Sequence, residues 1–227
     1  MFISSKVAVQ TSKQTKAPLL CKECEDLINK QGERWTLPRI ANEDKSFPLH
    51  TSLVTAEPDF VQRDMVGYSA AKNSEIDVQA LTHFALAIFW KASVHNWHDL
   101  GSDPQIDLGP YEEKLRGYVR NPRNETFPDH VTLLITLLPP ANVPLLTNIP
   151  VRAPGGEGFR NYKFYIPGIQ FVLSVGKTVD DEVCFYNNPL HFIWVSDIRS
   201  YVERSPARLI AQGSTAKQPK RAETRRR

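Results

Sequence analysis

Cys21 and Cys24 are the residues whose type and spacing point most directly to a chemistry. They form a C-x2-C pair in the segment PLLCKECEDLINKQGERW, which covers residues 18–35. Two thiolates at this spacing can bind one metal ion, because the turn between them points both sulfur atoms the same way. A structural zinc site needs four ligands, so this pair is half of one. The alternative is that both are ordinary thiols at the start of a helix.

Few other residues of the chain could complete such a site. His95 and His98 lie three residues apart at the end of a predicted helix, where they share one face. One interpretation is therefore a site made of Cys21, Cys24, His95 and His98. The competing interpretation, which the neighbouring residues favour, is that the two histidines interact with the C-terminal end of the helix dipole. Cys184, the third cysteine, lies in a predicted strand and is expected to be a small core residue.

No other motif predicts catalysis. G-x-S-x-G, H-E-x-x-H, G-x-G-x-x-G and the Walker loop are all absent from the sequence. We therefore expect no small-molecule substrate and assign no catalytic residue. His83 stands alone in an apolar segment, where a histidine is expected to be a satisfied core residue or a donor to a backbone carbonyl.

Charges are unevenly spread along the 227 residues. The net charge is +3, but residues 1–17 carry +3 and residues 217–227 carry +5, which leaves −5 for residues 18–216. A nucleic-acid-binding domain usually concentrates basic residues on its folded part, and here only the two ends are basic. The tail could contact phosphates without sequence specificity, or it is simply a solvated end. Its basic residues are Lys217, Lys220, Arg221, Arg225, Arg226 and Arg227.

Composition is that of a globular protein, with 41% hydrophobic and 23% charged residues. Three cysteines are too few for a disulfide scaffold and suit a reducing compartment. The first residues contain no apolar region of a secretory signal, and no stretch approaches the ~18 apolar residues of a membrane span. We expect a cytoplasmic protein without membrane contact.

Hydrophobic periodicity predicts a helix over residues 21–40, in which Gly32 is a weak point. Residues 41–58 are rich in turn-forming residues and are predicted to be a loop with a short extended piece at 49–55. The polar residues 1–17 are expected to be a flexible N-terminus.

The strongest structural signal is the segment 78–97. It is apolar nearly all round, which predicts a helix buried in the middle of a domain. Residues 74–77 resemble a capping box at its start. A further helix is predicted over residues 108–121, with Pro110 in its first turn.

After residue 121 the pattern changes to β-branched and aromatic runs bounded by turn residues, which predict strands. Pro167-Gly168 is expected to be a tight turn, and Ala153–Gly158 a flexible exposed loop. The predicted strands cover residues 130–138, 161–168, 169–176, 182–187 and 191–196.

Helices followed by strands predict an α+β fold, with an antiparallel sheet of four to five strands packed on the long buried helix. We expect one domain over residues 18–211, helical over 18–121 and strand-rich over 130–196. A C-terminal helix is predicted over 196–211. A disordered basic tail is expected over 212–227.

The segment around Leu20, Cys21, Cys24 and Glu25 resembles the second half-site, Leu-Leu-Cys-x-x-Cys-Glu, of uncharacterised bacterial proteins similar to HNH-endonuclease zinc domains. LTHFALAIFWKASVHNW and LGPYEEKLRGYV resemble their helical part. Members of that group carry a first C-x2-C and a histidine segment upstream, and both are missing here. The resemblance implies that Cys21 and Cys24 are structural zinc ligands, that the other two ligands lie upstream, and that this chain is shortened at its N-terminus.

Three functional hypotheses follow. The first is a bacterial zinc-binding relative of HNH-like proteins that is not catalytic as written and acts through nucleic acid or a partner protein. The second is a metal-dependent endonuclease, if the true start lies upstream and supplies the histidine as general base. The third is a metal-free module that binds another protein.

Overall fold

The computed structural model describes residues 2–3, 8–9, 18–62, 64–95, 106–122, 125–139, 147–177 and 188–196. Three predicted features lie outside these residues. They are the strand at 182–187, most of the C-terminal helix at 196–211, and the basic tail at 212–227.

The described residues form helices and a mixed sheet, so the predicted α+β class is correct. The sheet has seven strands in the order β3-β4-β9-β5-β8-β7-β6. Every neighbouring pair is antiparallel except β5 and β9, which are parallel. The strands are β3 (Phe60–Gln62), β4 (Met65–Ser69), β5 (Val131–Leu137), β6 (Asn148–Gly156), β7 (Phe159–Ile166), β8 (Ile169–Gly176) and β9 (Phe192–Ser196). A separate pair contains β1 (Phe2–Ile3) and β2 (Ala8–Val9).

The prediction of four to five antiparallel strands was wrong in number, and it did not include the parallel pair of β5 with β9. It missed β3 and β4, which are short and interrupted by turn residues. It also missed β6: the flexible loop predicted at Ala153–Gly158 is the end of this strand, up to Gly156, followed by the turn at 157–158. Prolines are tolerated in β6 because it lies at the edge of the sheet, where a missing N–H donor leaves no partner strand unsatisfied. The tight turn at Pro167-Gly168 was predicted correctly, and Gly168 has the positive φ of 80° that such a turn requires.

The predicted helix over residues 21–40 is present, but it is not a regular α-helix. α1 (Lys22–Ile28) continues into a π-helical turn, η1 (Asn29–Glu33), and then into α2 (Arg34–Thr36) and the 3-10 turn η2 (Leu37–Arg39). We call the whole run the N-terminal helix. Gly32, the predicted weak point, lies in the π-helical turn and is buried.

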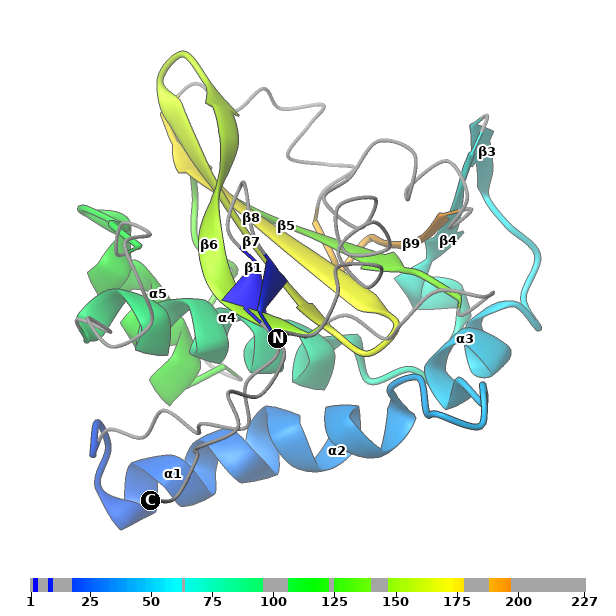
Figure 1. Ribbon diagram of the computed structural model, residues 1–227, viewed down its shortest axis with the longest axis horizontal. Coiled ribbons are helices and arrows are strands. Elements are labelled where there is room, and N and C mark those ends of the chain that lie inside the picture. Colours follow the sequence, from blue (N-terminus) through cyan, green and yellow to red (C-terminus); the bar gives the residue numbers. More distant parts are fainter. Residues whose placement is uncertain are drawn as a thin grey trace, which may run out of the picture.

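α4 (Val78–Val94) is the buried helix that the apolar segment predicts, although it ends three residues earlier than expected. It lies between the sheet on one side and the N-terminal helix on the other (Figure 1). Phe84 and Phe89 pack against Phe171 and Phe164 of the sheet, with ring centroids 6.0 and 4.9 Å apart. On the opposite side Gly32 lets the N-terminal helix approach the backbone of α4. Two packed layers thus explain why α4 is apolar nearly all round.

α5 (Tyr111–Arg120) lies beside α4 and is tied to it by two hydrogen bonds (Figure 1). Trp90 Nε1 donates to Glu112 Oε1 at 2.8 Å. His83 Nε2 is 2.9 Å from the carbonyl oxygen of Val119; since a carbonyl only accepts, the ring is protonated at Nε2. The expectation of a buried histidine that donates to the backbone is confirmed.

Two local predictions were wrong. Residues 49–55 were expected to be extended, but α3 (Pro48–Leu53) is a helix, with Pro48 in its first turn. The capping box at Ser74 does not form: the N-cap of α4 is Asp77, which accepts a hydrogen bond from the backbone N–H of Ala80 at 2.8 Å. A short 3-10 turn, η3 (Ala70–Lys72), precedes this cap.

Candidate functional site

The two cysteines lie at the start of the N-terminal helix. Cys21 is the N-cap residue of α1 and is exposed, and Cys24 is half-buried in the first turn. The two residues lie one turn apart at the start of the same helix, and the neighbouring Cys21 thiol is the largest cause that raises the pKa of the Cys24 thiol. The thiol of Cys21 also interacts with the carboxylate of Glu23. Cys21 and Cys24 therefore lie together in the first turn of α1, where Cys21 is open to solvent.

Charges around the thiol pair are mixed. The hydrogen bond with Cys21 raises the pKa of the Cys24 thiol above its ordinary value, and burial together with the charges of Cys21 and Glu23 adds to this effect. The positive charge of Arg120, at the end of α5, lowers the pKa of the Cys24 thiol and so opposes this effect. The pKa of Glu23 is lowered, first by a hydrogen bond from its own backbone N–H and then by the Cys21 thiol. The two thiols are the soft donors of this segment, and soft thiolates suit a divalent ion such as zinc.

Within the described ranges, no group of three or more His, Cys, Asp or Glu side chains is arranged to hold a metal ion. His95 follows the last residue of α4 as its C-cap and does not form such a group with Cys21 and Cys24. His98 and Cys184 lie outside the described residues, as do the basic residues of the tail. The structure therefore supplies two neighbouring thiols and leaves the further ligands open.

A second group of polar side chains lies on the sheet face opposite α4. The paired strands β5, β8 and β7 place Thr132, Ser174 and Asn161 in one row, and Thr136, Gln170 and Tyr165 in another. Between them runs a row of Leu134, Val172 and Lys163. We call these nine residues the polar face. Sequence reasoning missed it because each strand was assigned for its apolar residues, although polar residues at alternate positions carried the signal.

A third polar group lies between the N-terminal helix and α4. Thr36 Oγ1, Thr82 Oγ1 and His83 Nδ1 are buried and have no hydrogen-bond partner. Burial lowers the pKa of His83, and its hydrogen bond to Val119 opposes this effect. His83 Nδ1 lies 3.0 Å from the position a Cβ atom would take on Gly32, so this interface is closed and serves packing.

Comparison with family models, with curated proteins and with solved structures finds no match to this chain. None of the described helices is both long enough and apolar enough to cross a membrane. Function has to be inferred from the residues and their geometry.

Proposed function

We propose that Cys21 and Cys24 are half of a tetrahedral zinc site, and that the chain is a bacterial, cytoplasmic zinc-binding relative of HNH-like proteins that is not itself catalytic. The observation that supports this is the placement of both thiols in the first turn of one helix, with Cys21 exposed and Cys24 half-buried. Two thiols one turn apart at an accessible helix start can bind one ion with little rearrangement.

Zinc is the metal that fits this donor set best. Thiolates are soft ligands that select zinc over magnesium or calcium, and two thiolates neutralise one divalent ion. The first turn of α1 also carries Glu23 and Glu25, whose negative charges favour a cation at this point.

In this proposal the two remaining ligands come from outside the described residues: from undescribed residues of this chain, from further polypeptide, or from a second molecule of the chain. The resemblance to HNH-like proteins favours further polypeptide. Through such a completed site the protein would act on nucleic acid or on a partner protein, with the basic residues at 217–227 available for phosphate contacts.

A zinc competition titration against a coloured chelator tests the proposal. Wild type is expected to withdraw zinc from the chelator, and Cys24→Ala is expected to lose this ability. Cys184→Ala is the matched control, because it removes a thiol outside the pair and should behave as wild type. Equal zinc uptake and equal melting temperature for wild type and Cys24→Ala would contradict the proposal.

The same titration should depend on pH. Zinc binding must displace the thiol protons, and the raised pKa of Cys24 means that its proton is still bound near neutrality. Zinc affinity should therefore rise with pH, by about tenfold per pH unit for each proton released. An affinity that is flat across neutral and mildly alkaline pH would contradict thiol ligation.

Metal-dependent hydrolysis of phosphodiesters is the alternative that the HNH resemblance raises. It needs a histidine or other general base beside the metal, which a longer polypeptide would have to supply. Incubation of the protein with DNA and RNA in the presence of magnesium, manganese or zinc tests it, and cleavage that Cys24→Ala abolishes would establish the nuclease.

A metal-free interaction module is favoured by one separate observation. Strand β3 lies at the edge of the sheet, and Val61 on it is 72% exposed. A partner could add a strand at this edge. This alternative would be established if the chain binds no zinc, and if a partner protein that wild type and Cys24→Ala bind is no longer bound by Val61→Lys.

A further inference from the structure

Cys21 and Cys24 occupy two positions of a helix start whose side chains commonly reach toward each other. Cys21 is the N-cap residue of α1, with extended backbone angles (φ −73°, ψ 163°), and Cys24 is the third residue of the helix. In a capping box, the side chains at these same two positions bond back across the first turn. That turn is closed here, because the backbone N–H of Glu25 donates to the carbonyl oxygen of Cys21 at 3.0 Å. The fold therefore holds the two thiols at one fixed turn.

The dimensions of this turn suit a disulfide bond. Residues three apart along a helix have Cβ atoms about 5–6 Å apart, and a disulfide needs Cβ atoms about 3.5–4.5 Å apart. The approach that remains is small. Because Cys21 stands outside the helix, its backbone and side-chain torsion angles can make this approach without breaking a helical hydrogen bond.

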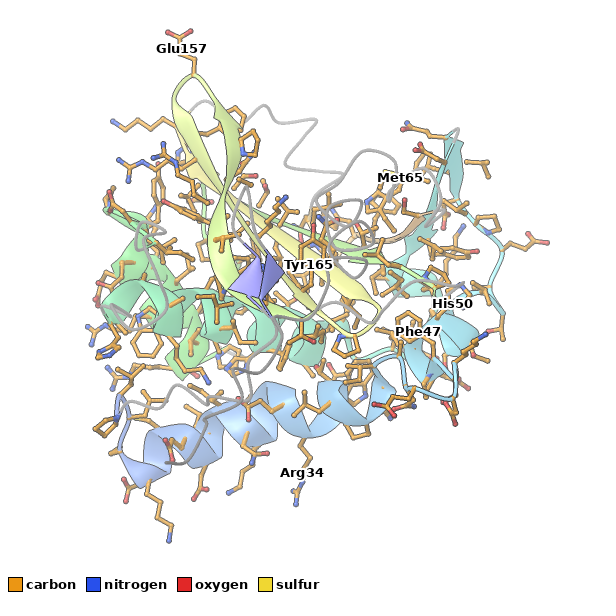
Figure 2. The ribbon with its side chains drawn as sticks, viewed as in Figure 1. Arg34, Phe47, His50, Met65, Glu157 and Tyr165 are labelled. Atoms are coloured by element: carbon orange, nitrogen blue, oxygen red, sulfur yellow. The ribbon has the colours of Figure 1, made fainter. Side chains whose placement is uncertain are left out.

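The thiol pair is also accessible, and a disulfide needs no further residue. Cys21 is exposed and Cys24 half-buried, and the start of the N-terminal helix lies at the edge of the molecule (Figure 1). Figure 2 shows that Arg34, farther along the same helix, points outward. Among the residues that the structure describes, no third His, Cys, Asp or Glu joins the pair to hold an ion. A metal site on this pair needs ligands from elsewhere, whereas a disulfide is complete with two sulfur atoms.

We propose that Cys21 and Cys24 form a reversible dithiol–disulfide couple, whose oxidant is a low-molecular-weight disulfide such as glutathione disulfide. The sulfur of the exposed Cys21 attacks one sulfur of the oxidant, whose S–S bond breaks, and one half leaves as a thiol with the proton that Cys21 gives up. The sulfur of Cys24 then attacks the Cys21 sulfur of this mixed disulfide, and the second half leaves with the proton of Cys24. Two electrons and two protons pass from the pair to the oxidant, and two molecules of the same thiol reverse the reaction.

Reversibility suits the reducing compartment that the sequence predicts, where disulfides are usually transient or redox-sensing. The couple itself does not depend on zinc. Its regulatory effect rests on the function proposed above: a disulfide leaves no thiolate to bind the ion, so oxidation of the pair expels zinc and reduction restores the half-site. The redox state of the thiol pair thus controls whether the metal is bound.

Equilibration of the full chain with mixtures of reduced and oxidised glutathione tests the couple, in a buffer whose chelator removes zinc. Remaining thiols are alkylated and the chain is digested with trypsin for mass spectrometry. Trypsin cuts after Lys22, between the two cysteines, so a bond from Cys21 to Cys24 appears as two joined peptides, lighter by two hydrogen atoms than the reduced pair. We expect both cysteines to lose alkylation together as oxidised glutathione increases.

The folded chain should favour this disulfide over the chain in concentrated urea. The equilibrium constant is expected to be larger in the folded chain by on the order of tenfold, because the unfolded chain must lose the entropy of closing the ring and the folded turn has already lost it. An equilibrium constant that is no larger in the folded chain would contradict the positioning of the pair by the helix start.

Two variants complete the test. Cys24→Ser should stop at the mixed disulfide, with one glutathione held on Cys21, because no second thiol displaces it. Cys184→Ala is the matched control and should show the same couple as wild type. Separate mixed disulfides on Cys21 and Cys24 in wild type, or a bond from either to Cys184 or to a second chain in place of the joined pair, would overturn the proposal.

The same series with added zinc separates this proposal from the zinc proposal. If the pair binds zinc, the ion stabilises the dithiol, and the oxidant needed for half oxidation should rise about tenfold for each tenfold of free zinc above the dissociation constant. A half-oxidation point that zinc leaves unchanged would contradict the zinc site and leave the couple standing. A pair that takes up zinc but forms no disulfide in its absence would overturn the couple alone.

Discussion

Gly32→Ala tests whether the N-terminal helix contacts α4 as closely as the structure describes. A Cβ atom on Gly32 would lie 2.8 Å from the backbone nitrogen of Phe84, 2.9 Å from its Cα and 3.0 Å from His83 Nδ1. Two of these three atoms are backbone, so no rotamer change relieves the contact and the two helices must separate. Overpacking of this kind costs about 1–3 kcal/mol, against which alanine gains about 1 kcal/mol of helix propensity.

The net loss is expected to reach about 2 kcal/mol of unfolding free energy, which lowers the melting temperature by up to roughly 8 °C for a chain of this size. Gly117→Ala is the matched control. Gly117 lies inside α5, and a Cβ atom there meets nothing within 4 Å. It should gain up to about 1 kcal/mol. Urea unfolding followed by circular dichroism measures both variants, and a Gly32→Ala protein as stable as Gly117→Ala would refute the close packing of the two helices.

Two further predictions concern α4. Asp77→Ala should lose about 1 kcal/mol of unfolding free energy in the same urea assay, because it removes the N-cap hydrogen bond. Ser74→Ala should change the unfolding free energy little. A larger loss for Ser74→Ala than for Asp77→Ala would contradict Asp77 as the cap and support the capping box at Ser74. The pKa of His83 is lowered by burial, so the unfolded chain binds more protons just below pH 6.5 and stability must fall as the pH drops through that range. His83→Gln should reduce this loss of stability at low pH more than His50→Gln does; burial also lowers the pKa of His50. Equal stability profiles against pH for wild type and His83→Gln would contradict a buried neutral ring at His83.

The sequence predicts α4 well because its signal is local. Apolar residues on all sides of a helix require partners on all sides, and the sheet and the N-terminal helix provide them. Gly32 was recognised as a weak point from helix propensity alone. Its role as a contact surface needed the structure, since nothing in the sequence shows which helix crosses it.

The sheet was harder to predict because its pairing is non-local. β6 carries two prolines, which argue for a loop unless the strand is known to lie at an edge. The parallel pairing of β5 with β9 joins segments more than fifty residues apart, and no local pattern encodes it. Strand order decides which polar residues become neighbours, so the polar face around Lys163 could not be found before the register of β5, β7 and β8 was known.

The sequence alone predicts that Cys21 and Cys24 lie near one another, since a spacing of three residues at a helix start brings two side chains to one turn whatever the rest of the fold does. The other ligands cannot be identified in the same way. Zinc sites join segments distant in sequence, and His95 at the end of α4 is not brought to the pair.

X-ray absorption at the zinc edge of the zinc-loaded protein tests the central claim most directly, because it counts the sulfur atoms bound to the metal. We predict at least two sulfur neighbours at about 2.3 Å, both lost in the Cys21→Ala, Cys24→Ala double variant. Only nitrogen and oxygen neighbours at about 2.0–2.1 Å, or a spectrum unchanged in that variant, would contradict a zinc site built on the thiol pair.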